Sequence, residues 1–233
     1  IASVAVNPEA LSKAPVAEPY SGPVLFEPYA AAQILAELLG RNLALRRRPV
    51  SEPGRPSSFA TSELEGRRGS RVLPEWMDVV DDPTAEQWRG HKLLGHYTVD
   101  LEGVVPQPVT LVEKGLLKNY LSTRQPTKGG TESNGRARLR GSFGANSATF
   151  SNMFVRASES STLPELKKKL IELVEQREKP YGLIIRKMDF PSSASVAEAQ
   201  RLLAQIAQDG SAARAVSLPI LAYRAYPDGR EEL

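Results

Sequence analysis

Residues 109–121 read VTLVEKGLLKNYL, two short apolar runs separated by a turn. Val109–Val112 and Leu116–Leu121 flank the three residues Glu113-Lys114-Gly115, with glycine where a left-handed backbone is required. This pattern predicts a β-hairpin, and therefore antiparallel neighbours in a sheet. Runs of similar character predict further strands at Met77–Val80, Thr98–Leu101, Thr149–Val155, Tyr181–Lys187 and Ala215–Tyr226.

Three segments have the periodicity of helices. In residues 21–35, SGPVLFEPYAAAQIL, the apolar run Val24–Phe26 predicts a strand that leads into an alanine-rich helix ending near Gly40. Thr162 and Glu165 have the spacing of a capping box before a second helix, and residues 196–206 carry apolar side chains at helical spacing for a third. Hairpins connect the strands as often as helices do. The predicted fold class is therefore α+β, a mainly antiparallel, twisted, barrel-like sheet with about three peripheral helices.

The chain divides into a short lead-in and one domain. Residues 1–19 lack periodicity, and residues 20–233 carry all the predicted elements. Residues 49–70 and 127–148 are rich in Gly, Ser, Pro and Arg, which predicts flexible loops. The sequence starts without methionine, and its last predicted hairpin lacks most of its second strand, so we expect a fragment of a longer protein.

Composition excludes several classes of function. The 233 residues include no cysteine, which rules out disulfides, thiolate nucleophiles and cysteine-ligated zinc. No apolar run approaches the roughly 20 residues that a membrane helix needs, and no signal peptide is recognisable. These features fit a cytoplasmic protein. The net charge of +3 is too small to indicate a nucleic-acid-binding protein by itself.

The ionisable side chains offer weak candidates for catalysis. His91 and His96 lie five residues apart, whereas zinc ligands on a helix usually lie four apart, and on a strand they would face opposite sides. Asp100 or Glu102 could complete a site only if the loop folded back toward them. Asp81 and Asp82, in DDPT, favour a turn over an acid pair because no matching base is identifiable.

Basic clusters at Arg46–Arg48 and Arg136–Arg140 allow an alternative function. They could contact nucleic acid through phosphates, although few aromatic residues lie near them to stack on bases. The glycines around Arg136–Arg140 do not form a phosphate-binding loop, because no helix follows them. The usual interpretation of such clusters is a solvated surface.

Several motifs together resemble one family. GPVLFEPYAAAQIL (22–35), DLEGVVPQPVTLVEKGLLKNYL (100–121), ESNGRAR (132–138) and SNMF (151–154) are similar to the C-terminal domain of the TldD/PmbA (TldE) family, once called modulators of DNA gyrase. The resemblance covers roughly residues 20–233, and the block at 100–121 is its most specific part.

The resemblance also implies which chemistry is missing. The family's proteolytic subunit carries His-Glu-x-x-x-His at the strand–helix junction, and aligning this motif places Phe26 and Ala31 at the two histidines, with only Glu27 matching. The family's third zinc ligand is a cysteine, which this chain lacks. The resemblance therefore implies a PmbA/TldE-like subunit with no metal, no other cofactor and no catalytic residues of its own. Asn152 matches the family's Thr-Asn motif and is the candidate substrate-binding residue, although Thr149 replaces the usual arginine there.

The implied function is that of a non-catalytic partner subunit. In the family, such a subunit pairs with a TldD-like, zinc-bearing subunit to enclose a chamber that admits unfolded or extended peptides. The alternative is a stand-alone binding or interaction domain, for nucleic acid or protein, with no proteolytic role. A third hypothesis, an enzyme that uses His91, His96 and Asp100, has no substrate that the sequence can name.

Overall fold

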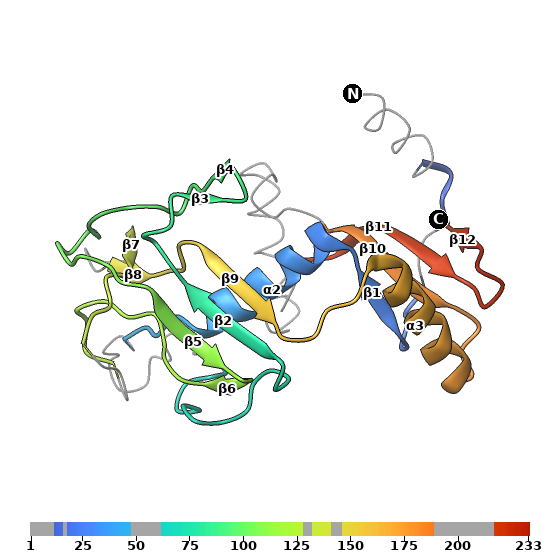
Figure 1. Ribbon diagram of the computed structural model, residues 1–233, viewed down its shortest axis with the longest axis horizontal. Coiled ribbons are helices and arrows are strands. Elements are labelled where there is room, and N and C mark those ends of the chain that lie inside the picture. Colours follow the sequence, from blue (N-terminus) through green and yellow to red (C-terminus); the bar gives the residue numbers. More distant parts are fainter. Residues whose placement is uncertain (1–11, 16–17, 48–61, 128–131, 141–145, 189–216) are drawn as a thin grey trace, which may run out of the picture. The chain divides into compact units, whose positions relative to one another are not determined.

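The computed structural model describes the chain except residues 1–11, 16–17, 48–61, 128–131, 141–145 and 189–216 (Figure 1). The chain divides into two compact units, one formed by residues 1–37 and 161–233 and the other by residues 38–160. The division falls inside helix α2, Pro28–Asn42. No helix in the described part is long and apolar enough to cross a membrane.

The described residues of the first unit form a four-stranded sheet with a helix on each face. Its strands lie in the order β1-β10-β11-β12, where β1 is Val24–Phe26, β10 is Gly182–Met188, β11 is Pro219–Ala225 and β12 is Glu231–Glu232. Strand β1 runs parallel to β10, and the other pairs are antiparallel.

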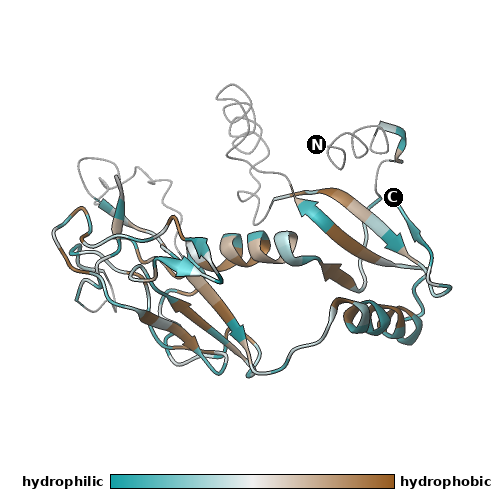
Figure 2. Cartoon of the chain, turned by 45° about the horizontal axis from the view of Figure 1, so that its top comes forward, coloured by the Kyte–Doolittle hydropathy of each residue, from teal (hydrophilic) through white to brown (hydrophobic). Residues whose placement is uncertain are grey.

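Consecutive residues of β10 point to opposite faces of the sheet and contribute to the two cores of this unit. Ile185 packs with Ala30 of α2 on one face, and Ile184 packs with Leu170 of α3, Leu163–Gln176, on the other. Figure 2 shows hydrophobic residues concentrated in the strands, whereas α3 is hydrophilic over much of its surface. A helix that buries one stripe and exposes charged residues elsewhere is typical of the edge of a domain.

The second unit is built on an antiparallel sheet of order β6-β5-β2-β9. Its strands are β2 (Met77–Asp81), β5 (Val109–Glu113), β6 (Leu116–Leu117) and β9 (Met153–Ala157). Two small hairpins accompany this sheet, β3 (Gln87–Trp88) with β4 (His91–Lys92) and β7 (Ala137–Arg140) with β8 (Asn146–Ala148). Among the described residues, the fully buried apolar side chains of this unit include Leu43, Val79, Leu111, Val112, Leu117 and Leu121.

The predicted hairpin at residues 109–121 is confirmed, with a tighter turn. Strand β5 extends through Glu113, which pairs with Leu116, so the turn consists of Lys114 and Gly115 alone. Both have positive φ, 46° and 73°, which matches the primed turns that favour the twist of a hairpin. A Cβ on Gly115 would lie 2.2 Å from the carbonyl oxygen of Leu73, so glycine is required there. Strand β6 is shorter than the predicted run to Leu121.

Other predictions need correction. The α+β class and the antiparallel pairing are confirmed, but the described strands form separate sheets, because β10 pairs with β1 and β11 while β2 pairs with β5 and β9. The barrel-like sheet is thus not confirmed. Thr98–Leu101 is no strand, since the Asp100 carboxylate accepts hydrogen bonds from the backbone N–H groups of Glu102 and Val104 and shapes a turn. The segment 127–148, predicted as a loop, contains the β7–β8 hairpin.

The helix predictions can be tested only in part. Helices α2 and α3 lie where the periodicity placed them, and α3 begins with the predicted capping box of Thr162 and Glu165. The third predicted helix, residues 196–206, lies outside the described residues. Most of the predicted loop at 49–70 lies outside them too, and only residues 62–70 are described, as turns.

Candidate functional site

The junction between β1 and α2 is where the resemblance places the metal motif. Phe26 ends β1 and packs against the core of Ala30, Ile185 and Met188. Ala31 lies in the first turn of α2, and its backbone N–H donates to the carbonyl oxygen of Glu27 over 2.8 Å. Neither a phenyl ring nor a methyl group can ligate a metal. Glu27 is therefore the one residue of this motif with a ligand atom.

The Glu27 carboxylate is bound by an arginine. The Nε of Arg186, in β10, donates to Glu27 Oε1 over 3.0 Å, and both side chains are mostly buried, with 30% and 22% of their surface exposed. The Nη2 of Arg186 donates to Glu231 Oε2 over 2.7 Å. Its guanidinium also lies 4.0 Å from the ring centre of Tyr223. One cation thus connects two carboxylates and an aromatic ring.

This network extends to α3 and is electrostatically balanced. Lys167 of α3 donates to the other carboxylate oxygen of Glu231. Burial opposes the charge of Arg186, but the hydrogen bond and charge of Glu27, with Tyr223 and Glu231, outweigh it and raise the pKa of Arg186 above its usual value. Among the described residues, no three His, Cys, Asp or Glu side chains gather closely enough to hold a metal ion.

Asn152, the candidate substrate-binding residue, is 92% buried immediately before β9. Its Oδ1 accepts a hydrogen bond from the N–H of Gly95 over 3.0 Å. Its Nδ2 donates to the carbonyl oxygens of Asp82 and Ala85, each over 3.0 Å. The amide therefore fastens both ends of the segment 82–95, a positioning role that the sequence did not reveal. Contact of Asn152 with substrate stays a prediction.

A buried ion pair lies beneath this segment, and the sequence analysis missed it. Asp81 and Arg136 are both fully buried, and Arg136 Nε donates to Asp81 Oδ2 over 2.5 Å. The Asp81 carboxylate also accepts from the backbone N–H and the hydroxyl of Ser151. The remaining guanidinium N–H groups donate to the carbonyl oxygens of Asp81, Gln107 and Asn134. Every polar atom of the pair has a partner, as a buried ion pair requires.

Among the described residues, the histidines and the arginines at positions 136 and 138 do not form a site. Arg136 is buried and cannot contact phosphate, while the guanidinium of Arg138 lies 4.2 Å from the ring centre of Tyr97. His96 Nδ1 lies 3.0 Å from the carbonyl oxygen of Pro83, whereas His91 is exposed on β4. Asp100 is occupied by three backbone N–H groups, those of Glu102 and Val104 and that of Ala137.

Comparison with known proteins gives a consistent picture. Residues 19–193 match the model of the PmbA/TldA metallopeptidase C-terminal domain. Two curated relatives named "Metalloprotease" are similar: one from Methanothermobacter thermautotrophicus, 37% identical over 78 residues, and one from Archaeoglobus fulgidus, 34% identical over 76. These stretches cover 33% and 32% of this chain but only 16% of each relative.

One solved structure supports the fold, and a second aligns less well. A proposed modulator of a DNA gyrase from Thermotoga maritima aligns with a TM-score of 0.50 at 18% identity. The alignment covers 82% of this chain and 37% of the Thermotoga chain. TldE from Thermococcus kodakarensis aligns with a TM-score of 0.47 at 18% identity, covering 72% of this chain and 33% of its own. The chain therefore corresponds to only part of the length of the proteins it resembles.

Proposed function

Because the chain belongs to the family of PmbA/TldA metallopeptidase C-terminal domains, we propose that its parent protein is the non-catalytic partner subunit of a zinc-bearing relative. The observation that carries this proposal is the pairing of Glu27 with Arg186 at the junction of β1 and α2. In the resemblance, this glutamate is the residue between two zinc-binding histidines.

The chemistry of the junction favours a role without zinc. A catalytic zinc ion needs about three protein ligands and an open position for water. Phe26 and Ala31 supply no ligand atom, and the chain has no cysteine for a third. A guanidinium beside Glu27 would also repel a divalent cation, since like charges a few ångströms apart interact unfavourably in a partly buried site.

The retained scaffold suggests what the subunit contributes. Each unit keeps a hydrogen-bonded sheet, and we propose that these sheets contribute to the wall of a proteolytic chamber whose zinc site belongs to the TldD-like partner. Unfolded or extended peptides would be the substrates, since a sheet edge can hold an extended chain through its backbone with little demand on sequence. A cytoplasmic location is part of the same proposal.

The test is to reconstitute the pair. The full-length parent is purified with and without a relative that carries His-Glu-x-x-x-His, and zinc content and cleavage of an unfolded peptide are measured for each subunit and for the mixture. We expect zinc and cleavage only when the relative is present, with a stable complex at micromolar concentrations. As a matched control, the glutamate of the relative's own motif is changed to glutamine, which should abolish cleavage and leave the complex intact.

Two results would contradict the proposal. One is stoichiometric zinc in the parent alone together with cleavage that a chelator removes. The other is a failure of the two subunits to associate. If the isolated parent instead bound oligonucleotides with an affinity that falls steeply with salt, the alternative of a nucleic-acid-binding domain would replace it.

A further inference from the structure

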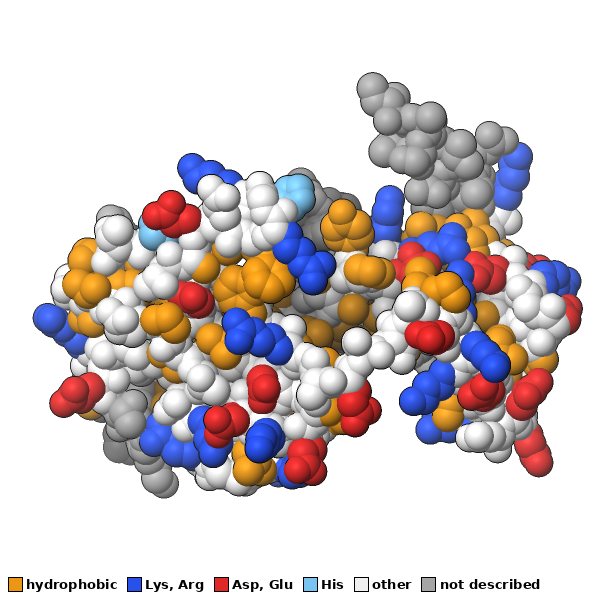
Figure 3. Space-filling view, in the orientation of Figure 1, with side chains coloured by type: hydrophobic (Ala, Val, Ile, Leu, Met, Phe, Trp, Pro, Cys, Tyr) orange, Lys and Arg blue, Asp and Glu red, His pale blue; other side chains and the backbone are white. Residues whose placement is uncertain are grey.

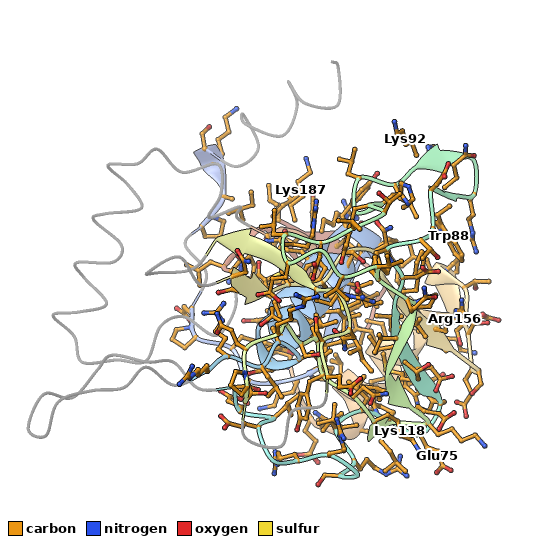
Figure 4. All side chains as sticks on the ribbon, turned by 90° about the vertical axis from the view of Figure 1, so that its left-hand side faces the viewer. Glu75, Trp88, Lys92, Lys118, Arg156 and Lys187 are labelled. Atoms are coloured by element: carbon orange, nitrogen blue, oxygen red, sulfur yellow. The ribbon has the colours of Figure 1, made fainter. Side chains whose placement is uncertain are left out.

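The segment Glu86–Gly95, termed here the β3–β4 arm, presents apolar and basic side chains to solvent. Leu94 is 94% exposed and Trp88 is 47% exposed. Arg89 and Lys92 lie between them in the sequence, against the single acidic residue Glu86. Figure 3 shows basic and histidine side chains along the upper edge, where β3 and β4 lie, and Figure 4 shows Lys92 projecting outward at that end.

The arm is held in one conformation. Its turn, Arg89-Gly90, has positive φ at both residues, 49° and 82°, as in the tightest hairpins. The ring of Trp88 packs on Phe154 of β9, with 5.1 Å between ring centres. At the base, the N–H of Leu93 donates to the carbonyl oxygen of Glu86 over 2.8 Å, and Asn152 binds Gly95. A surface that is already ordered loses little conformational entropy when it binds.

We propose that the β3–β4 arm is a contact surface for the zinc-bearing partner subunit, which would offer an apolar pocket for Leu94 rimmed by carboxylates for Arg89 and Lys92. This rests on the proposed function and adds to it the surface by which the two subunits meet. Removing an aliphatic side chain from water is favourable, and tryptophan and arginine are enriched among the residues that dominate interfaces. The excess of basic residues on the arm selects an acidic partner.

The same observations favour a protein over a nucleic acid or a membrane. Trp88 packs against Phe154 with the two rings tilted by 53°, and the Arg89 guanidinium lies 5.5 Å from the centre of the Trp88 ring, so part of the indole is already in contact and less of it is available to a base. Arg89 and Lys92 are only two cations, and the affinity for a nucleic acid grows with the number of phosphates that a protein contacts. An isolated leucine beside them is too small an apolar area to anchor the arm in a lipid layer.

The test uses the full-length parent and its zinc-bearing relative. The double substitution Leu94→Asp with Lys92→Glu alters two exposed side chains. The control Val105→Asp with Lys168→Glu makes the same changes outside the arm, at a valine that is 63% exposed and at an exposed lysine of α3. Kd is measured by calorimetry, and far-UV circular dichroism checks the fold. We expect the arm variant to raise Kd about 30-fold or more, the value for residues that dominate an interface, and the control to leave Kd within about 3-fold.

Each other outcome contradicts a different statement. If the unaltered subunits bind and the arm variant binds equally well, the contact surface is wrong and the partner function stands. If the unaltered subunits do not bind, the proposed function itself fails. Binding of the unaltered parent to phosphatidylserine–phosphatidylcholine vesicles or to oligothymidylate, lost in the arm variant while subunit association is retained, would assign the arm to a membrane or a nucleic acid and overturn the proposal.

Discussion

Replacing Arg136 with methionine should destabilise the unit formed by residues 38–160 more than any exposed substitution in it. Methionine preserves much of the apolar volume of Arg136 but removes every guanidinium donor. The substitution leaves Asp81 fully buried with only Ser151 as a donor, and it leaves the carbonyl oxygens of Gln107 and Asn134 without their bonds from Arg136. A buried charge that loses its partner is the expensive case, whereas the intact pair is close to neutral.

The expected size follows from that burial. Breaking a fully buried ion pair costs about 3 to 5 kcal/mol. For a protein of this size each kcal/mol lowers Tm by roughly 2 to 4 °C, which gives a decrease of about 6 to 20 °C. The matched control is Arg138→Met, two residues further on in β7, where an exposed guanidinium over Tyr97 contributes only about 0.5 to 1 kcal/mol.

Tryptophan fluorescence during urea unfolding measures this effect in the correct unit. Both tryptophans of the chain, Trp76 and Trp88, belong to residues 38–160. Adding Asp81→Asn to Arg136→Met should recover stability, because the buried group is then neutral and still accepts a bond from Ser151. A loss below about 1 kcal/mol for Arg136→Met, or a double variant no more stable than the single one, would refute the argument that an uncompensated charge dominates.

Three further predictions concern single residues. Burial is the main cause that raises the pKa of Tyr97 to about 12. The contribution of Tyr97 to stability is therefore complete below pH 10 and is lost as pH rises from 10 to about 12. Absorbance titration and urea unfolding of Tyr97→Phe, compared with the unaltered protein, would detect this loss. Thr162→Ala should destabilise α3 by about 0.5 to 2 kcal/mol, measured by hydrogen exchange. The hydrogen bonds from Thr162 lower the pKa of Glu165, so the benefit of this cap should fade as pH falls below 4.5. Arg186→Met should cost roughly 1 kcal/mol, less than Arg136→Met, because the pair with Glu27 is partly exposed and water screens it, and protection of β10 amides would report the loss.

Local patterns explain what the sequence could predict. The β5–β6 hairpin is specified by Lys114 and Gly115 between two apolar runs, and the start of α3 by the reciprocal bonds of Thr162 and Glu165. Each involves residues within a few positions of one another, so its geometry follows from the local sequence. The prediction of a strand at Thr98–Leu101 was wrong because of another local interaction. The Asp100 carboxylate accepts hydrogen bonds from nearby N–H groups, and these bonds compete with strand pairing.

Contacts between distant residues could not be predicted this way. Arg136 meets Asp81 across 55 positions, and Asn152 binds Gly95 across 57. In the sequence, Arg136 looked like one member of a surface cluster, and Asp81 looked like part of a turn. The pairing of β2 with β9 brings the segments of Asp81 and Asn152 together, and burial then reverses the interpretation of Arg136 from a solvated cation to part of the core.

Glu27 shows how such a contact changes the interpretation of a motif. A comparison of letters finds a glutamate that has lost the two flanking histidines, which describes a metal site with ligands removed. The fold adds Arg186, 159 positions away, whose guanidinium bonds to the same carboxylate. Phe26 also packs into the core, so a histidine there would bury a polar ring where no partner exists among the residues of that core. Arg186 therefore neutralises the one carboxylate of this junction. If histidines replaced Phe26 and Ala31, the Arg186 guanidinium would still repel a metal ion beside Glu27.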